Sequence, residues 1–281
     1  MSQDPAELKS MALYRGVDRI HAELAAAGLD REQALCVSDL TAFDQYHYHG
    51  TDAVDIAIAS FDIKSDDRVL EIGSGIGGPA RHIADTTGAK VIALELQPDL
   101  DETARDLTNR CGLTQRVEHV CGDVLDYSPG DLRFDVIVSW LAFFHIEQRQ
   151  ELLARCKSWL KPSGGLFVED LFARSKFTSD EQEDLEVILF SRYLPSRDVY
   201  EEDFRDAGFS GIHATDMSED WRRFTHERYE SFCENRQRQE SVHGKELVAG
   251  LDSFYGAVAR LFNGGHLGGI RLVAKNNGGF S

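Results

Sequence analysis

The amino-acid sequence predicts an α/β fold built around a mostly parallel sheet. From residue 67 onward, short apolar runs alternate with longer amphipathic stretches. The first apolar run ends in a glycine-rich turn, and the last, HLGGIRLVAKN, lies near the end of the chain. Strands that alternate with helices imply βαβ units with right-handed crossovers. With 281 residues, of which 42% are hydrophobic, the chain can bury one large core and carry a small appendage.

Each element of this core follows from its local pattern. The expected strands are short apolar runs, in order DRVLEIG, AKVIALEL, RVEHVCGD, FDVIVSW, LFVEDLF, SGIHATDMS and HLGGIRLVAKN. The helices expected between them are GGPARHIADTTG, DLDETARDLTNRCGL, RQELLARCKSWLKPSGG and DVYEEDFRDAGF. Pro162 and Gly164 are expected to close the third of these helices.

Helical segments are expected around the core. Residues 5–40 predict two helices that are separated at Gly28, with Asp30 as the cap of the second, and residues 221–262 are expected to be largely helical. A further helix is expected at about residues 51–60. The predicted parts are a helical N-terminal cap with an aromatic lid at residues 1–60, a core at 61–174, a cap insertion at 175–196, and the rest of the core with a long helical segment and the last strand at 197–281.

The net charge limits the partners that we expect. The chain has 48 acidic and 30 basic residues, which gives a formal net charge of −18. Such a surface repels phosphate backbones and anionic lipid, so neither nucleic acid nor a membrane is expected as a partner. The acidity fits either a hydrated surface suited to high salt or an ordinary acidic bacterial enzyme.

A cytoplasmic protein without a metal site is the expectation from the remaining composition. No apolar run reaches the roughly 18 residues of a membrane span, and the N-terminal MSQDPAELKS lacks a basic and apolar leader. The five cysteines are far apart and form no CxxC pair, so neither a zinc site nor a disulfide framework is indicated.

A glycine-rich turn, EIGSGIGG at residues 71–78, follows the first strand. Glycines there allow a tight turn and a close approach of the backbone to a ligand, and the next helix presents its N-terminal amides. Because Gly73, Gly75 and Gly78 also satisfy the dinucleotide pattern GxGxxG, a nicotinamide or flavin enzyme is the alternative.

Carboxylates near the strand ends argue against a dinucleotide. Glu71 would repel a pyrophosphate but can attract the ammonium of an amino acid. Glu95, at the end of the next strand, can accept both ribose hydroxyls, as it could in an NAD protein. Asp123, after the third strand, can accept a hydrogen bond from an adenine amino group. Together the three carboxylates describe a nucleoside joined to an amino acid.

Residues 65–172 resemble the core of class I methyltransferases that depend on S-adenosylmethionine (SAM). The matching pieces are VLEIGSGIGG, ALEL, GDV, FDVIVSW and LKPSGG. The resemblance implies a Rossmann-like sheet of seven strands with a reversed last strand, SAM across the strand carboxyl ends, and S-adenosylhomocysteine as product. The predicted cofactor-binding residues are Gln45, Tyr48, Glu71, Gly73, Ser74, Gly75, Glu95, Leu96, Gln97, Asp123, Val124, Ser139 and Trp140.

Two segments are expected to form the acceptor site. FDQYHYHG at residues 43–50 gathers aromatic and imidazole groups that could cover a sulfonium, although a linker that packs its tyrosines is the alternative. SWLAFFH at residues 139–145 leaves the fourth strand and carries His145, whose alternative role is structural; Trp140 could pack on adenine or belong to the core. Methyl transfer to an amine mainly requires alignment of its lone pair with the methyl carbon. The predicted catalytic residues are His145, Tyr46 and His47.

Beyond the core, the chain resembles the small-amine N-methyltransferases of the phosphoethanolamine and sarcosine/dimethylglycine type. The shared features are an N-terminal cap, a histidine that matches His145, a cap insertion, and an ending with FNGG and LGGIRLVA. The resemblance implies that His145 positions the acceptor or removes its proton, with help from a tyrosine; Tyr14, Tyr46 and Tyr48 compete for that role. No basic phosphate pocket can be placed. The predicted substrate-binding residues are Tyr14, His49, Arg174, Arg192, Tyr193, Asn263 and Arg271.

The sequence therefore predicts an enzyme, monomeric or homodimeric, that methylates a nitrogen of a small polar metabolite: an amine, an amino acid or a histidine-derived imidazole. One alternative is a methyltransferase of sulfur- or selenium-substituted histidine, a fainter resemblance in which an arginine of the cap or Arg271 binds a carboxylate. Another is an O- or C-methyltransferase of a larger apolar molecule, held by the cap helix LEVILF. The intact set of SAM motifs argues against a silent scaffold, and the loop SWLA lacks the segment that grips an extruded base.

Overall fold

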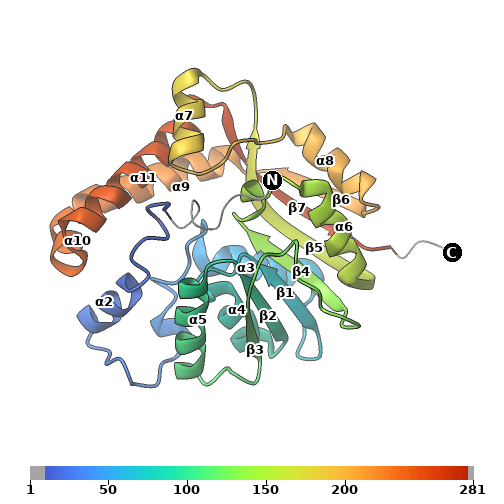
Figure 1. Ribbon diagram of the computed structural model, residues 1–281, viewed down its shortest axis with the longest axis horizontal. Coiled ribbons are helices and arrows are strands. Elements are labelled where there is room, and N and C mark those ends of the chain that lie inside the picture. The colour runs from blue at the N-terminus through green and yellow to red at the C-terminus, as the bar shows by residue number, and fades with distance from the viewer. Residues whose placement is uncertain (1–9, 278–281) are drawn as a thin grey trace.

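Seven strands form one sheet in the order β3-β2-β1-β4-β5-β7-β6 in the computed structural model, which describes residues 10–277 (Figure 1). β7 is antiparallel to both β5 and β6, and the other neighbouring strands are parallel. The predicted fold class, including the reversed last strand, is confirmed. The strands are β1 (Arg68–Ile72), β2 (Lys90–Glu95), β3 (Val117–Cys121), β4 (Phe134–Trp140), β5 (Leu160–Ala173), β6 (Ser210–Asp216) and β7 (Leu267–Lys275).

Helices cover both faces of the sheet (Figure 1). Leu152 and Phe204 belong to the core on one face, and Val54 and Ile83 to the core on the other. All residues of β1 after Arg68 are buried, which is why its sequence is a continuous apolar run, as expected inside a parallel sheet. The helices of these layers are α6 (Arg149–Trp159) and α8 (Arg197–Asp206) on the first face, and α3 (Gly50–Phe61) and α4 (Gly78–Thr87) on the second; α5 (Pro98–Arg110) packs along β2 and β3.

A helical cap joins segments that are far apart in the sequence. In Figure 1, α9 and α11 run side by side away from the sheet, and α10 at their far end lies next to α2. One apolar cluster contains Met11 from the N-terminal segment, Leu189 from the insertion and Phe254 from α11. The cap helices are α2 (Arg19–Ala26), α7 (Ser179–Val187), α9 (Ser218–Glu234), α10 (Arg236–His243) and α11 (Lys245–Gly264).

The N-terminal segment differs from the expected pair of helices. Gly16 has φ +68°, a conformation that interrupts a helix, and α2 begins only at Arg19. The second expected helix is reduced to a single 3-10 turn, η1 (Val37–Asp39). The guanidinium of Arg110 donates to the backbone oxygens of Asp30 and Gln33, so this segment satisfies its backbone against α5 instead of within a helix. Part of the first expected helix lies outside the described residues.

The third core helix is also shorter than expected. α6 ends at Trp159, and Pro162 and Gly164 lie inside β5. The residue before a proline is pushed toward extended backbone, and Leu160 already pairs with Phe134 of β4. The chain therefore leaves the helix earlier than its apolar pattern suggests.

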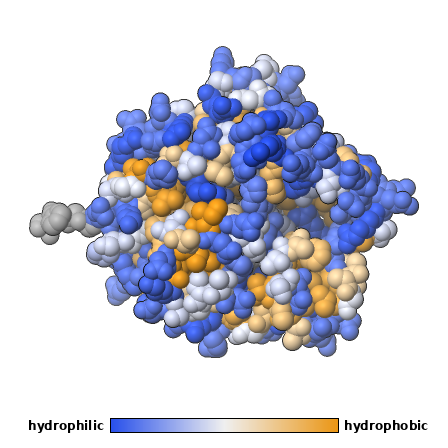
Figure 2. Space-filling model, turned by 180° about the vertical axis from the view of Figure 1, so that it is seen from behind, coloured by the Kyte–Doolittle hydropathy of each residue, from blue (hydrophilic) through white to orange (hydrophobic). Residues whose placement is uncertain are grey.

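The surface is largely hydrophilic. Figure 2 shows one face on which hydrophilic residues dominate and apolar residues form separate patches. The large apolar side chains that are exposed include Val187 and Tyr193 of the insertion. Within residues 10–277, no helix combines the length and the apolar character that a membrane crossing requires.

Candidate functional site

A large cavity opens where the carboxyl ends of the central strands meet the cap. It encloses about 1440 Å³ of empty space, a figure that includes the part open to solvent. The predicted site residues that line it are Tyr14, Tyr46, His47, Tyr48, Glu71, Gly73, Ser74, Gly75, Glu95, Leu96, Asp123, Val124, Trp140 and His145.

The glycine turn forms one wall of this cavity. Gly73 has φ +75° and Gly75 has φ +55°, which a residue with a side chain rarely adopts. The Gly73 amide donates to the carbonyl oxygen of Leu94 over 2.9 Å. A Cβ on Gly73 would lie 2.4 Å from Cβ of Ala142, so the loop after β4 packs directly on the turn. The sequence therefore needs glycine here for both backbone angle and space.

Glu95 ties the turn to the end of β2. Its carboxylate accepts hydrogen bonds from the Gly75 amide over 2.7 Å and from the Gln97 amide over 2.9 Å. Burial raises the pKa of Glu95 to about 7, although these amides favour the charged form. A carboxylate has about four lone-pair sites, so beyond the amides of Gly75, Leu96 and Gln97 it can still accept from a ligand hydroxyl in the cavity.

Glu71 is a buried carboxylate that lacks part of its hydrogen bonding. Burial raises its pKa well above the usual range, and the nearby Arg81 guanidinium opposes that shift. Its Oε2 atom has no hydrogen-bond partner among the described residues. Buried polar atoms are normally satisfied, so an ammonium or amide donor from a ligand would complete this group.

Asp123 follows β3 at the rim of the cavity. Its Oδ1 accepts from the Leu125 amide over 2.8 Å, which fixes the side chain in a local turn. Its other oxygen leaves an acceptor for a ligand N–H, which fits the predicted contact with an adenine amino group.

His145 lies in the 3-10 turn η2 (Phe143–His145) after β4. Its Nδ1 faces the carbonyl oxygen of Phe190 at 3.4 Å, and because a carbonyl can only accept, Nδ1 carries the proton. Its buried Nε2 has no partner among the described residues. Burial lowers the pKa of His145 to about 4, so the ring is neutral at pH 7 and offers a lone pair at Nε2.

Tyr14 is the tyrosine that accompanies His145. The two ring centroids are 6.5 Å apart, whereas Tyr46 and Tyr48 have other neighbours. Burial is the largest cause that raises the pKa of Tyr14, followed by the charge of Glu95, so its hydroxyl is protonated at neutral pH.

A buried carboxylate holds the turn that carries His145. Asp170 of β5 accepts from the Phe144 amide over 3.2 Å and from the Tyr200 hydroxyl over 2.6 Å. Arg149 lies 3.7 Å from the same carboxylate. Burial raises the pKa of Asp170 to about 6. This network holds η2 against β5 and was not predicted from the sequence.

The aromatic segment at residues 43–50 closes the cavity from the cap side. His47 donates from Nε2 to the Gly50 carbonyl oxygen over 2.9 Å, because a carbonyl can only accept. Its ring lies 5.5 Å from that of Trp140, and burial lowers its pKa to about 4. Tyr48 packs edge-on against Trp221. The segment is thus both packed and facing the cavity.

Three predicted cofactor residues do not line the cavity. Ser139 is fully buried and donates to the Ile72 carbonyl oxygen over 2.9 Å, so it supports the sheet beneath the site. Gln45 donates to Asp44 over 2.9 Å beside the start of α4. Gln97 precedes α5 as its N-cap, and its amide is used by Glu95.

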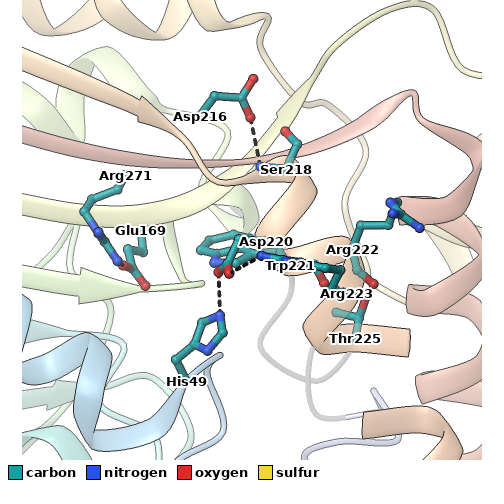
Figure 3. A network of polar contacts seen from close by, with 10 residues as sticks. All are labelled: His49, Glu169, Asp216, Ser218, Asp220, Trp221, Arg222, Arg223, Thr225 and Arg271. Carbon is teal, nitrogen blue, oxygen red and sulfur yellow. Dashed lines mark hydrogen bonds and ion pairs between the residues drawn. The ribbon is translucent and has the colours of Figure 1, made fainter. Parts of the chain in front are cut away.

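Most of the predicted substrate residues also lie elsewhere. Figure 3 shows His49 directed at Asp220, with Nε2 2.6 Å from Oδ2, and Arg271 beside Glu169, to which it donates over 2.7 Å. Each of these two side chains is already paired with a carboxylate of the protein, so neither is left to bind a charged substrate. The remaining predicted residues, Arg174, Arg192, Tyr193 and Asn263, are exposed and do not line the cavity.

Two charged residues of the cavity were missed. Asp44 lies inside the aromatic segment and forms a fully buried ion pair of 2.9 Å with Arg81. Arg228 of α9 is the single arginine or lysine among the described residues that line the cavity. Its spacing of four from Phe224 and seven from Trp221 places it on the apolar face of that helix, a signal that could have been noticed.

Comparisons with known proteins agree with this geometry. A family profile described as "Methyltransferase domain" matches residues 69–164. Glycine/sarcosine/dimethylglycine N-methyltransferase of Actinopolyspora halophila is 30% identical over 56% of the chain and 28% of its own length. Phosphoethanolamine N-methyltransferase of Plasmodium falciparum is 24% identical over 72% of the chain and 76% of its own length.

Solved structures share the fold over almost the whole chain. Phosphoethanolamine N-methyltransferase 2 of Haemonchus contortus aligns with a TM-score of 0.81 at 19% identity and covers 97% of this chain and 59% of that one. The cyclopropane synthase MmaA2 of Mycobacterium tuberculosis aligns with a TM-score of 0.77 at 14% identity and covers 98% and 99%. The chain thus spans about a quarter of the first curated relative and most of the second. Residues 69–164 thus match a methyltransferase domain, and the solved structures show that the chain shares their fold.

Proposed function

We propose that the protein uses SAM to methylate a nitrogen of a small polar metabolite. The observation that carries the proposal is a group of buried polar atoms without partners among the described residues, all in residues that line one cavity. They are Glu71 Oε2, Ser74 Oγ, Trp140 Nε1 and His145 Nε2. Native proteins leave few such atoms unsatisfied, so a ligand that complements both donors and acceptors is expected there.

The residues of the core side fit SAM. Gly73 and Gly75 let the backbone approach the ligand. Glu95 can accept hydrogen bonds from the ribose hydroxyls. Glu71 can accept a hydrogen bond from the ammonium of SAM, and Asp123 can accept one from the adenine amino group. The Haemonchus relative has been solved with S-adenosylhomocysteine and, separately, with SAM, which supports the same assignment. When bound, SAM supplies a methyl group on a positively charged sulfur.

The residues of the cap side can align an acceptor nitrogen. His145 Nε2 can accept an N–H from the acceptor and turn its lone pair toward the donor. With a pKa of about 4, His145 binds protons too weakly to remove one from an alkylammonium. This favours an acceptor nitrogen that is neutral near pH 7, as in an imidazole, or one that loses its proton to solvent before binding.

Charge supports a small acceptor. The formal net charge of −18 opposes binding of a nucleic acid. A second candidate function is C- or O-methylation of an apolar molecule, because Met11, Leu189 and Phe254 give the cap side an apolar lining. A 24-methylenesterol C-methyltransferase of Oryza sativa is 34% identical over 43% of the chain.

The test is a screen of amines, amino acids, imidazoles and sterols that measures release of S-adenosylhomocysteine. A nitrogen acceptor should be methylated, and His145→Ala should lower kcat by about 10²-fold while SAM affinity stays within a few-fold. His226→Ala is the control, because His226 is exposed on α9. Turnover of sterols alone would contradict N-methylation, and an equal loss of kcat and of SAM affinity would make His145 structural.

A further inference from the structure

Arg228 brings a positive charge into an otherwise acidic cavity. It lines the cap side together with Leu189, Phe254 and Val258, and the glycine turn forms the opposite wall. The lining also includes the carboxylates of Glu71, Glu95 and Asp123. Among the described lining residues, Arg228 is therefore the one guanidinium, and it lies on the side of the cavity where the methyl acceptor would bind.

The charge of Arg228 has no carboxylate partner within residues 10–277. The other arginines of α9 do have one: Arg222 pairs with Glu219 at 2.6 Å, and Arg223 pairs with Asp220 at 3.5 Å. Arg228 instead lies over aromatic rings, 5.0 Å from the centroid of Tyr48 and 4.8 Å from that of Tyr255. A buried or half-buried guanidinium without a counter-charge is costly, which suggests that a ligand supplies one.

Ring contacts leave part of the hydrogen-bonding edge of Arg228 free, although the guanidinium also has a side-chain hydrogen bond with Tyr48. Cation–π packing uses the flat faces of the guanidinium, whereas its N–H donors point outward in the plane. The buried Nε of Arg228 has no hydrogen-bond partner among the described residues. The aromatic rings thus hold the group in one orientation, and its Nε–H remains a donor for an anion.

A second arginine adds to the positive potential behind these tyrosines. The guanidinium of Arg19 lies 4.6 Å from the ring centroid of Tyr46, and no described carboxylate lies within ion-pair distance of it. Arg19 does not line the cavity, so Arg228 is the contact group. One guanidinium matches a singly charged carboxylate, whereas a phosphate near charge −2 beside three lining carboxylates would remain poorly compensated.

We infer that Arg228 binds the carboxylate of the methyl acceptor, so that the acceptor is an amino acid and not a simple amine or a phosphate ester. The inference rests on the proposed function and narrows its substrate class. With the carboxylate on Arg228, the acceptor nitrogen is directed across the cavity toward His145 and the donor side.

The experiment compares acceptors in matched pairs. Glycine is paired with methylamine, histidine with histamine, and phosphoethanolamine with ethanolamine, and release of S-adenosylhomocysteine is measured for the wild type, Arg228→Gln and Arg228→Lys. A carboxylated acceptor should have a kcat/KM at least about 10-fold above that of its decarboxylated partner. Arg228→Gln should raise its KM by about 10- to 100-fold, and Arg228→Lys should recover part of that loss.

Controls separate this role from stability and from donor binding. Arg223→Gln, on the same helix but exposed, should change nothing. SAM affinity, measured by calorimetry, should be unchanged in Arg228→Gln, because the inference gives Arg228 to the acceptor. Thermal unfolding checks that both Arg228 variants are folded, and the kinetics of Arg228→Lys decide the matter if the glutamine variant is not.

Several results would overturn the inference. The inference is wrong if the enzyme prefers the decarboxylated or the phosphorylated member of a pair. It is also wrong if the preference for the carboxylated member persists in Arg228→Gln, or if that variant loses affinity for SAM. If the enzyme turns over neither member of any pair, the same compounds are titrated into the protein saturated with S-adenosylhomocysteine. The inference is then overturned if no carboxylated compound binds more tightly than its partner without the carboxylate. Methylation of uncharged amines would leave the proposed function standing, whereas failure to bind SAM would remove both.

Discussion

Burial sets the protonation state of the groups that face the cavity. The pKa of His145 and that of His47 fall to about 4, so both rings are neutral over the physiological range. Glu95 is the exception, because its pKa of about 7 places its titration close to working conditions. The site therefore contains neutral histidines on the cap side and, on the core side, two carboxylates, Glu71 and Glu95, whose pKa burial raises.

The titration of Glu95 predicts a pH dependence of donor binding. Below pH 7 the free protein holds a proton on Glu95, and the charged carboxylate is the better acceptor for two hydroxyls. SAM affinity should rise by up to about tenfold per pH unit from pH 5 to 7 and level off above. Without ligand the sign is opposite for stability: a raised carboxyl pKa stabilises the fold below the unfolded value, and that contribution is lost as pH rises through about 7.

Calorimetric titrations of SAM from pH 5 to 8.5 check this dependence. Glu95→Gln should bind more weakly at pH 8 and lose the slope, whereas Glu118→Gln, an exposed change on β3, should keep it. A slope that is the same in Glu95→Gln would show that another group is responsible.

Local spacing explains which residues could be predicted. Gly73, Glu95 and Asp123 each end or follow a strand, and parallel strands bring their carboxyl ends to one edge, so a pattern along the chain fixes their place. Arg228 and Tyr14 reach the cavity only through packing of the cap, and Arg271 is neutralised by Glu169 from a strand about a hundred positions away. The spacing of Arg228 on α9 indicates its helix face but not the cavity that it enters, and the Arg271–Glu169 pair depends on a tertiary contact that no local pattern contains.

At the scale of elements, a buried ion pair connects the aromatic segment to the helix of the glycine turn. Arg81 of α4 donates to Asp44 over 2.9 Å, and its other nitrogen contacts the Ala104 carbonyl oxygen and the Thr108 hydroxyl at 3.3 Å each. Gly78 packs against Asp44, and a Cβ at Gly78 would lie only 2.4 Å from the Asp44 carbonyl oxygen. The aromatic segment at residues 43–50 is thus joined directly to the glycine turn that forms one wall of the cavity.

Removing one partner of this pair should be costly. Asp44→Ala would leave the Arg81 guanidinium buried without its counter-charge, and we expect the free energy of unfolding to fall by about 3–5 kcal/mol. Urea denaturation measures this, with Asp66→Ala at an exposed turn as the control. The double variant Asp44→Leu/Arg81→Met should recover part of the loss. A loss below about 1 kcal/mol in Asp44→Ala would mean that water or another acidic group compensates Arg81.

The elements also show where sequence patterns fail. The strands and core helices were predicted because their apolar periods are long and regular. The helix expected at residues 30–40 does not form because Arg110 and the Asp39 contact to the Cys36 amide, at 2.8 Å, satisfy its backbone in another way. Local helix signals were present, but a tertiary partner outweighed them.

At the scale of the molecule, the cavity lies between the carboxyl ends of the sheet, where we propose that the donor binds, and the cap, where we propose that the acceptor binds. The order of the sheet follows from βαβ alternation and from the reversed β7, so it could be expected from the sequence. The helical segments of the cap were expected, but their contacts could not be, because the cap is assembled from residues near Met11, Leu189 and Phe254, which no single pattern links. This explains why more of the predicted cofactor residues than of the predicted substrate residues line the cavity.

The net charge predicts how salt affects the whole molecule. A formal charge of −18 produces self-repulsion that dissolved ions screen, since the Debye length falls from about 10 Å at 0.1 M to about 3 Å at 1 M. The melting temperature should rise by several degrees between 0.05 and 1 M NaCl. The exposed ion pairs weaken in salt but contribute little. Differential scanning calorimetry checks this, and a melting temperature that falls with salt would show that surface pairs outweigh the repulsion.

Titration of SAM into the purified protein at pH 8 tests the central claim most directly. We predict saturable binding of one SAM per chain, competition by S-adenosylhomocysteine, and no binding of NADH, with much weaker binding in Asp123→Ala and in Gly73→Ala. No heat at saturating SAM, or NADH bound in its place, would contradict the account.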